Sequence, residues 1–205
     1  MLDKKGFDLW ADGYDKSVNI SDNDSTYPFA GYKEILNIIY NEILALKPKI
    51  ILDIGFGTGT LTSKLYERGI EIYGQDFSDQ MLKISQEKMP FANLYVKDFS
   101  DGLDGALLAN KYDAIIATYS MHHLEDEDKI KFIKSLMPLL NDGGKILIGD
   151  VAFKSLEELE NCKKQAANSW DDDEFYFVFD KFRDYFPNST FIPVSNCSGV
   201  INIKE

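Results

Sequence analysis

The sequence predicts an α/β fold, a doubly wound and mostly parallel seven-stranded sheet with helices on both faces and an antiparallel hairpin at its C-terminal edge. Two observations predict it. Short apolar segments alternate with helical ones from residue 32 to residue 151, the pattern of βαβ units around a parallel sheet. The first apolar segment ends in a turn that contains Gly55, Gly57 and Gly59, directly before a helix. Such a turn lets backbone amides approach an anionic ligand without a Cβ in the way.

The first half of the chain predicts three strands and the helices around them. Isoleucine and leucine at helical spacing predict a helix over 32–46, which Pro48 ends. Gly69 stops the next helix and Ser78 caps the one after it. The segments that follow the first helix are strand 50–54, helix 60–68, strand 70–75, helix 78–88 and strand 94–97.

The second half predicts four more strands, of which the last two form the hairpin. Its segments are strand 112–118, helix 126–140, turn 141–144, strand 145–151, helix 155–167 and the hairpin 190–203. The acidic run 171–174 is typical of a solvated loop, and Phe179, Phe182 and Phe186 stand near helical spacing. We expect one domain over 1–205, with an N-terminal segment 1–31, a core 32–152 and a C-terminal part 153–205.

Composition and charge exclude several classes of partner. A formal net charge of −12 disfavours nucleic acids and anionic membranes, which bind through Lys and Arg. No stretch approaches the roughly 18 apolar residues of a membrane span, and residues 1–8 lack the apolar core of a signal peptide. Cys162 and Cys197 are far apart and have no metal or redox spacing. We therefore expect a cytoplasmic protein.

Three acidic residues fall at the carboxyl ends of successive strands, which line one crevice in a doubly wound sheet. Asp53 lies inside the first strand, Asp76 ends the second, and Asp98 follows the third. Asp76 stands 21 residues after Gly55, where a carboxylate can accept hydrogen bonds from two ribose hydroxyls. In the dinucleotide fingerprint G-x-G-x-x-G, a third glycine would replace Thr60. This departure argues against a nicotinamide cofactor.

Several motifs together resemble the S-adenosylmethionine-dependent methyltransferases with the Rossmann-like fold (class I), of the small-molecule type. The run 53–59, Asp-Ile-Gly-Phe-Gly-Thr-Gly, resembles their first motif, and 76–82, Asp-Phe-Ser-Asp-Gln-Met-Leu, resembles their second. The later motifs are similar at 97–99, 112–117, 120–124 and 141–146. The resemblance covers about residues 10–152. It implies S-adenosylmethionine as the cofactor, S-adenosylhomocysteine as the product and a methyl group as the group transferred.

The resemblance also implies a role for each residue at the cofactor site. The glycines would approach the methionine moiety, Asp53 would hold its amino group, and Asp76 would bind the ribose. Phe77 and Met81 would sandwich adenine, Asp98 would accept from its amino group beside Phe99, and Thr118 or Tyr119 would border the methionine end. Tyr14 belongs to an N-terminal segment that would cover the cofactor. The implied cofactor-binding set is Asp53, Gly55, Gly57, Gly59, Asp76, Phe77, Met81, Asp98, Phe99, Thr118, Tyr119 and Tyr14.

The residues that would handle the acceptor are less determined. His122 and His123 are the only histidines and follow the fourth strand. One of them could serve as a base or orient the acceptor, and the alternative is a structural hydrogen bond at the next helix. We expect no metal, because no third ligand lies nearby in sequence. The segment 117–120, Ala-Thr-Tyr-Ser, lacks the prolines of nucleic-acid amine methyltransferases. A small-molecule acceptor is therefore expected.

Three alternatives remain open on the sequence. The chain could be an NAD(P)-dependent oxidoreductase, or a non-catalytic regulatory module that binds S-adenosylmethionine, since methyl displacement needs no diagnostic catalytic residue. Aromatic residues near the N-terminus and after the fifth strand either form a lid over the site or fill a satellite core. Oligomeric state does not follow from the sequence.

Overall fold

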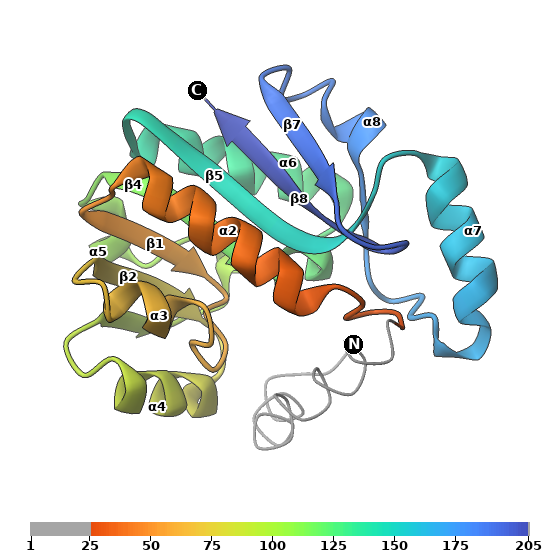
Figure 1. Ribbon diagram of the computed structural model, residues 1–205. Helices are drawn as coiled ribbons and strands as arrows, with labels where there is room; N and C mark the ends of the chain where they lie inside the picture. Colours follow the sequence, from red (N-terminus) through yellow and green to blue (C-terminus); the bar gives the residue numbers. More distant parts are fainter. Residues whose placement is uncertain (1–25, 205) are drawn as a thin grey trace.

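The computed structural model describes residues 26–204 and confirms the predicted fold class. One sheet carries the strands in the order β3-β2-β1-β4-β5-β8-β7, with helices on both faces (Figure 1). β8 runs antiparallel to both of its neighbours, and the other strands of this path share one direction. The strands are β1 (Ile50–Ile54), β2 (Glu71–Asp76), β3 (Asn93–Val96), β4 (Tyr112–Thr118), β5 (Leu140–Phe153), β7 (Ser189–Pro193) and β8 (Ser198–Lys204).

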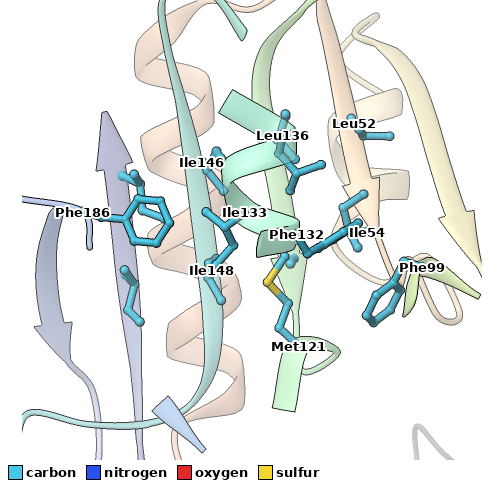
Figure 2. Close-up of a cluster of buried hydrophobic side chains, with 14 of the residues drawn as sticks. Leu52, Ile54, Phe99, Met121, Phe132, Ile133, Leu136, Ile146, Ile148 and Phe186 are labelled. Carbon is cyan, nitrogen blue, oxygen red and sulfur yellow. The ribbon is translucent and has the colours of Figure 1, made fainter. Parts of the chain in front are cut away.

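Alternate residues of the central strands feed two cores, one on each face of the sheet. Ile51 points to the face covered by α2, while Leu52 points to the opposite face, where α6 packs. Figure 2 shows Phe132, Ile133 and Leu136 of α6 lying against the strands. Burial on both faces explains why these strands are almost continuously apolar. The helices of this part are α2 (Tyr32–Leu46), α3 (Thr62–Tyr66), α4 (Asp79–Lys88), α5 (Gly105–Leu108) and α6 (Asp126–Leu136).

The helix predicted over 126–140 is shorter in the structure. α6 ends at Leu136, and a 3₁₀ turn, η3 (Met137–Leu139), follows it. Pro138 lies in this turn, where its ring and missing N–H prevent the helix from continuing. Leu140 already pairs with Tyr112 of β4, and the pairing shifts register before Ala114 meets Lys145. The expected turn 141–144 is therefore an irregular part of the long strand β5.

The C-terminal part differs from the helical pattern seen in its aromatic residues. After α7 (Leu156–Ala166) and the turn η4 (Ala167–Ser169), the short strand β6 (Phe177–Val178) pairs with the end of β5. Only α8 (Phe179–Phe182) is helical in the aromatic segment. Phe179, Phe182 and Phe186 are buried in the core on the α6 face, so burial rather than a continuous helix explains their spacing. The predicted C-terminal hairpin is confirmed as β7 and β8.

No helix within residues 26–204 combines the length and apolar character that crossing a bilayer requires. The predicted single domain, with its divisions at 31 and 152, stays a prediction.

Candidate active site

A pocket lies at the carboxyl ends of β1, β2 and β4, where a doubly wound sheet places its ligands. The glycine turn after β1 forms one wall, and the segment after β4 forms another. Most residues that the sequence predicts at a cofactor site meet here. The lining residues are Tyr32, Leu36, Gly55, Phe56, Gly57, Thr58, Thr60, Leu61, Thr62, Asp76, Phe77, Met81, Phe99, Thr118, Tyr119, Ser120 and His123.

The three glycines of the turn all have positive φ angles, of 72°, 53° and 71°, but their surroundings differ. A Cβ on Gly55 would stand 2.4 Å from the Cβ of Ser120, and one on Gly59 would stand 2.9 Å from the hydroxyl of Ser85. A Cβ on Gly57 would meet nothing within 4 Å. Gly55 and Gly59 therefore serve close packing of the turn, while Gly57 leaves its backbone open on the pocket side.

Asp76 ties the glycine turn to the end of β2. Its Oδ2 accepts a hydrogen bond from the Gly57 N–H at 2.9 Å, and its Oδ1 accepts one from the Ser78 N–H at 2.9 Å. The side chain is buried, with 5% of its surface exposed, and it lines the pocket. The carboxylate thus holds the turn in shape and presents negative charge to the pocket.

Two side chains of α4 donate hydrogen bonds to backbone carbonyls of the same turn, and the sequence did not predict these contacts. The hydroxyl of Ser85 donates to the Gly57 carbonyl at 2.8 Å, and the Nζ of Lys88 donates to the Thr58 carbonyl at 2.7 Å. Both residues lie about thirty positions after the turn, so no local motif connects them. The predicted cap of this helix is confirmed, since the Ser78 hydroxyl accepts from the Met81 N–H at 3.1 Å.

Asp53 lies in β1 just before the turn, is 1% exposed and is not among the residues that line the pocket. Its Oδ2 accepts a hydrogen bond from the Thr62 hydroxyl. Its Oδ1 is buried and has no hydrogen-bond partner among residues 26–204. Burial raises the pKa of Asp53 to about 7, opposed by the Thr62 hydrogen bond and supported by the charge of Asp76. A buried carboxylate with one unsatisfied oxygen is suited to binding a cationic group.

The remaining predicted residues divide between the pocket and its surroundings. Phe77, Met81 and Phe99 line one end of the pocket, and Met81 packs against Phe56. Asp98 is exposed, is absent from the pocket lining, and caps the 3₁₀ turn η1 (Phe99–Asp101) by accepting from the Ser100 N–H at 2.8 Å. Tyr14 lies outside the described residues.

The other end of the pocket is bordered by Thr118 and Tyr119 after β4. Tyr119 has a φ of 50°, in the left-handed region that few side chains other than glycine adopt. Its ring lies 5.2 Å from the rings of both Phe29 and Tyr32. One aromatic residue just before α2 and the first residue of α2 thus pack against Tyr119 at this end of the pocket.

Relatives of the chain carry the name of one enzyme family. A family model described as "Methyltransferase domain" matches residues 52–146. An uncharacterized methyltransferase of Geobacillus sp. (strain WCH70) is 34% identical over 192 residues, which is 90% of this chain and 87% of that protein. One of Alkaliphilus oremlandii (strain OhILAs) is 33% identical over 181 residues, covering 86% and 78%. The chain belongs to this methyltransferase family.

Solved structures support the same assignment at the level of the fold. A magnesium protoporphyrin IX methyltransferase from Synechocystis PCC 6803, with bound S-adenosylhomocysteine, superimposes with a TM-score of 0.67 at 19% identity, over 86% of this chain and 85% of that one. An S-adenosylmethionine-dependent methyltransferase from Clostridium acetobutylicum ATCC 824 gives 0.67 at 16% identity, over 93% and 98%. The methyltransferase therefore has the class I Rossmann-like fold predicted from its motifs.

The two histidines of the methyltransferase occupy different positions on the 3₁₀ turn η2 (Met121–His123). His123 lines the pocket, whereas His122 is buried behind it, with its Nδ1 2.6 Å from Oδ1 of Asp150 on β5. Burial would lower the pKa of His122, but the charge and hydrogen bond of Asp150 outweigh it and raise the pKa. Burial lowers the pKa of His123 to about 3, and the neighbouring His122 adds to the shift.

Of the two alternatives for the aromatic residues after β5, a lid over the site or a satellite core, the contacts of Trp170 and Tyr176 fit the satellite core. Trp170 stacks on Tyr27 with ring centroids 5.1 Å apart, and Tyr176 meets Trp170 edge-on at 4.9 Å. The ring of Phe153 on β5 lies 6.5 Å from both Trp170 and Tyr176. These rings join the core on the α2 face, whereas Phe175 of the same segment is exposed.

Proposed function

We propose that this protein transfers the methyl group of S-adenosylmethionine to a small-molecule acceptor by in-line displacement. The observation that carries the proposal is the pocket wall itself, where the buried carboxylate of Asp76 and the open backbone of Gly57 lie together, with the buried carboxylate of Asp53 on the same strand-turn unit. S-adenosylmethionine has a cationic amino group, a carboxylate and a ribose, and this set of groups matches its chemistry. The cofactor supplies the reactive methyl group, and the protein supplies position.

Each part of the cofactor has residues suited to it. Asp53, with its unsatisfied Oδ1, would accept from the amino group, and the backbone at Gly57 would lie against the methionine moiety. The second carboxylate, Asp76, would bind the ribose hydroxyls while it holds the turn. Phe77 and Met81 would lie against adenine beside Phe99. Among the described residues of the predicted set, Asp53, Gly59 and Asp98 do not line the pocket, and Asp98 is the one that is exposed and caps η1 instead.

The acceptor end of the pocket would be the one bordered by Thr118, Tyr119 and His123. We infer that His123, as the histidine that lines the pocket, orients the acceptor beside the methyl group. The net charge of −12 supports a small molecule over a nucleic acid, whose phosphates it would repel. Cys162 and Cys197 are both free thiols, which agrees with the predicted cytoplasmic location.

The cofactor assignment is tested by replacing the ribose carboxylate. We expect Asp76→Ala to weaken binding of S-adenosylhomocysteine by about 1–3 kcal/mol, roughly 5- to 150-fold, because buried donors lose their partner. Isothermal calorimetry measures this loss. Asp142→Ala removes an exposed carboxylate at the far end of β5 and should bind normally. Unchanged affinity in a folded Asp76→Ala protein, or tighter binding of NADH than of S-adenosylhomocysteine by the unaltered protein, would contradict the proposal.

The acceptor class is tested with labelled methyl donor and a cell extract separated by size. We expect label to enter the low-molecular-weight fraction in the presence of the protein, and to remain in the donor without it. Label found only in the nucleic-acid or protein fraction would contradict a small-molecule acceptor. Absence of transfer to any fraction, with the donor still bound, would favour the non-catalytic binding module instead.

A further inference from the structure

Beside the pocket, the fold assembles a cluster that the sequence does not reveal. One ligand atom each from His122, His123 and Glu174 lie within 4.8 Å of one another. The two histidines belong to η2 after β4, and Glu174 lies in the segment before β6. This segment is fastened to η2, since the Phe175 N–H donates to the His122 carbonyl at 2.8 Å. Two imidazoles and a carboxylate from distant parts of the chain thus converge.

The imidazole of His122 is oriented toward this cluster by a buried carboxylate. Its Nδ1 contacts Oδ1 of Asp150 at 2.6 Å, and Asp150 is 1% exposed. Asp150 is itself held by the backbone N–H groups of Met121 and Val151. With Nδ1 engaged in this way, the Nε2 of His122 faces Oε1 of Glu174 at 3.5 Å. Histidines that bind metals almost always donate their other ring N–H to such a carboxylate or carbonyl.

The two carboxylate oxygens of Glu174, like the two ring nitrogens of His122, have different partners: one is held by a hydrogen bond and the other faces the cluster. Its Oε2 accepts a hydrogen bond from the Tyr176 hydroxyl at 2.8 Å, and that hydroxyl in turn contacts the hydroxyl of Tyr27. Oε1 is the atom that faces His122. Hydrogen bonds to the outer atom fix a ligating carboxylate in the way that they fix a ligating imidazole. The side chains of His122 and Glu174 are therefore both held in a fixed orientation without an ion.

Charge also favours a cation at this place. Two carboxylates, Asp150 and Glu174, face the imidazole of His122 at close range. One buried cation, Lys129, lies in the same region, where its Nζ donates to the Phe175 carbonyl and pairs with Asp126 at 3.1 Å. A divalent ion between the imidazoles and Glu174 would lie next to these two carboxylates, whose negative charge favours a cation.

We propose that His122, His123 and Glu174 bind a divalent first-row transition-metal ion, for which we take Zn²⁺ as the probe. Imidazole nitrogen and carboxylate oxygen suit such ions, and Zn²⁺ sites with three protein ligands leave a fourth position open. His123 also lines the pocket, so the proposed ion would lie at the edge of the pocket, beside the end assigned to the acceptor. If the proposed methyl transfer holds, the ion binds the acceptor atom and favours loss of its proton to solvent before the methyl group is transferred.

The test is a calorimetric titration of the metal-stripped protein with Zn²⁺, with Co²⁺ absorption to report the coordination. We expect one site per chain. Glu174→Gln should weaken Zn²⁺ binding more than about tenfold, and Asp150→Asn should weaken it about 10- to 100-fold by releasing His122. Glu160→Gln removes the same charge from an exposed position on α7 and should bind as tightly as the unaltered protein.

Two results would overturn the metal site. One is Zn²⁺ affinity in the unaltered protein no greater than in His122→Ala/His123→Ala, and the other is unchanged affinity in a folded Glu174→Gln protein. Either would leave an Asp150–His122 hydrogen bond and a His122–Glu174 ion pair that need no metal ion. Titration of the same samples with S-adenosylhomocysteine separates this failure from that of the proposed function. A protein that binds S-adenosylhomocysteine but not Zn²⁺ refutes the metal site alone.

Discussion

Gly55→Ala is expected to destabilise the protein by about 2–5 kcal/mol. The φ of 72° at Gly55 lies in the left-handed region, which costs a residue with a Cβ about 1–2 kcal/mol. The new Cβ would also stand 2.4 Å from the Cβ of Ser120. Ser120 cannot move away easily, because its hydroxyl donates to the Ile54 carbonyl at 2.8 Å and its side chain is buried. Overpacking of this kind adds about 1–3 kcal/mol.

Gly143→Ala is the matched control for the clash. Gly143 has a φ of 77°, and a Cβ there would meet nothing within 4 Å. Its replacement should therefore cost only the backbone term, about 1–2 kcal/mol. Urea denaturation of the unaltered protein and the two variants measures three free energies of unfolding, whose differences give the two losses. Equal losses in the two variants would show that the contact between the glycine turn and Ser120 carries no energetic weight.

Asp53 is expected to make the protein less stable as the pH rises from about 4 to about 7. Burial raises its pKa in the folded protein to about 7, against an ordinary value of 3.8. Within this window the folded state retains a proton that the unfolded state has lost, so stability falls as the pH increases and levels off above the folded-state pKa. Asp76 and Thr62, the groups that act on Asp53, remain in place when it is replaced.

Asp53→Asn isolates this contribution. We expect the variant to gain about 2–3 kcal/mol relative to the unaltered protein when both are moved from about pH 5 to about pH 8, because asparagine has no charge to bury. Urea denaturation at the two pH values provides the four free energies. The difference between the proteins matters here, since other groups titrate equally in both. A difference that does not change with pH would mean that Asp53 is ionised throughout the range.

The same ionisation should couple to cofactor binding. If Asp53 holds the amino group of S-adenosylmethionine, its ionised form must bind, and affinity should fall as the pH is lowered below about 7, by up to about tenfold per unit. Asp53→Asn should lose this dependence together with the affinity. The burial of Asp53 lowers the stability of the protein without cofactor, and this cost is understandable if the cationic amino group of the cofactor pairs with the carboxylate on binding.

Much of the fold could be predicted because its signals are local. The strands read as apolar runs, and β1 and β4 have the predicted bounds. Ser78 forms the predicted cap because its hydroxyl and the amide it accepts from are three residues apart. The helix predicted over 126–140 was too long, because apolar residues at helical spacing continue past Pro138, where the backbone cannot remain helical. The glycine turn could be predicted for the same reason, because its φ angles depend on residues next to one another.

The surroundings of the site depended on contacts between distant residues, and only the tertiary structure decided them. Ser85 and Lys88 hold the glycine turn from a helix about thirty residues later. Asp98 follows the third strand as expected, but its side chain caps η1 and does not line the pocket. The hydrogen-bond partners of these side chains depend on how the helices pack at the ends of the strands. The spacing of residues in the sequence does not specify that packing.

The sequence by itself determined the family and the class of fold, and it predicted a place for the methyl donor, because glycines and acids at fixed intervals mark these features locally. It predicted no metal, because no third ligand lies near His122 and His123 in the chain. The tertiary structure brought Glu174 to them by pairing β6 with β5. The surroundings of the two histidines were decided by this late segment packing onto η2. This contact joins residues some fifty positions apart, and the sequence contains no local signal for it.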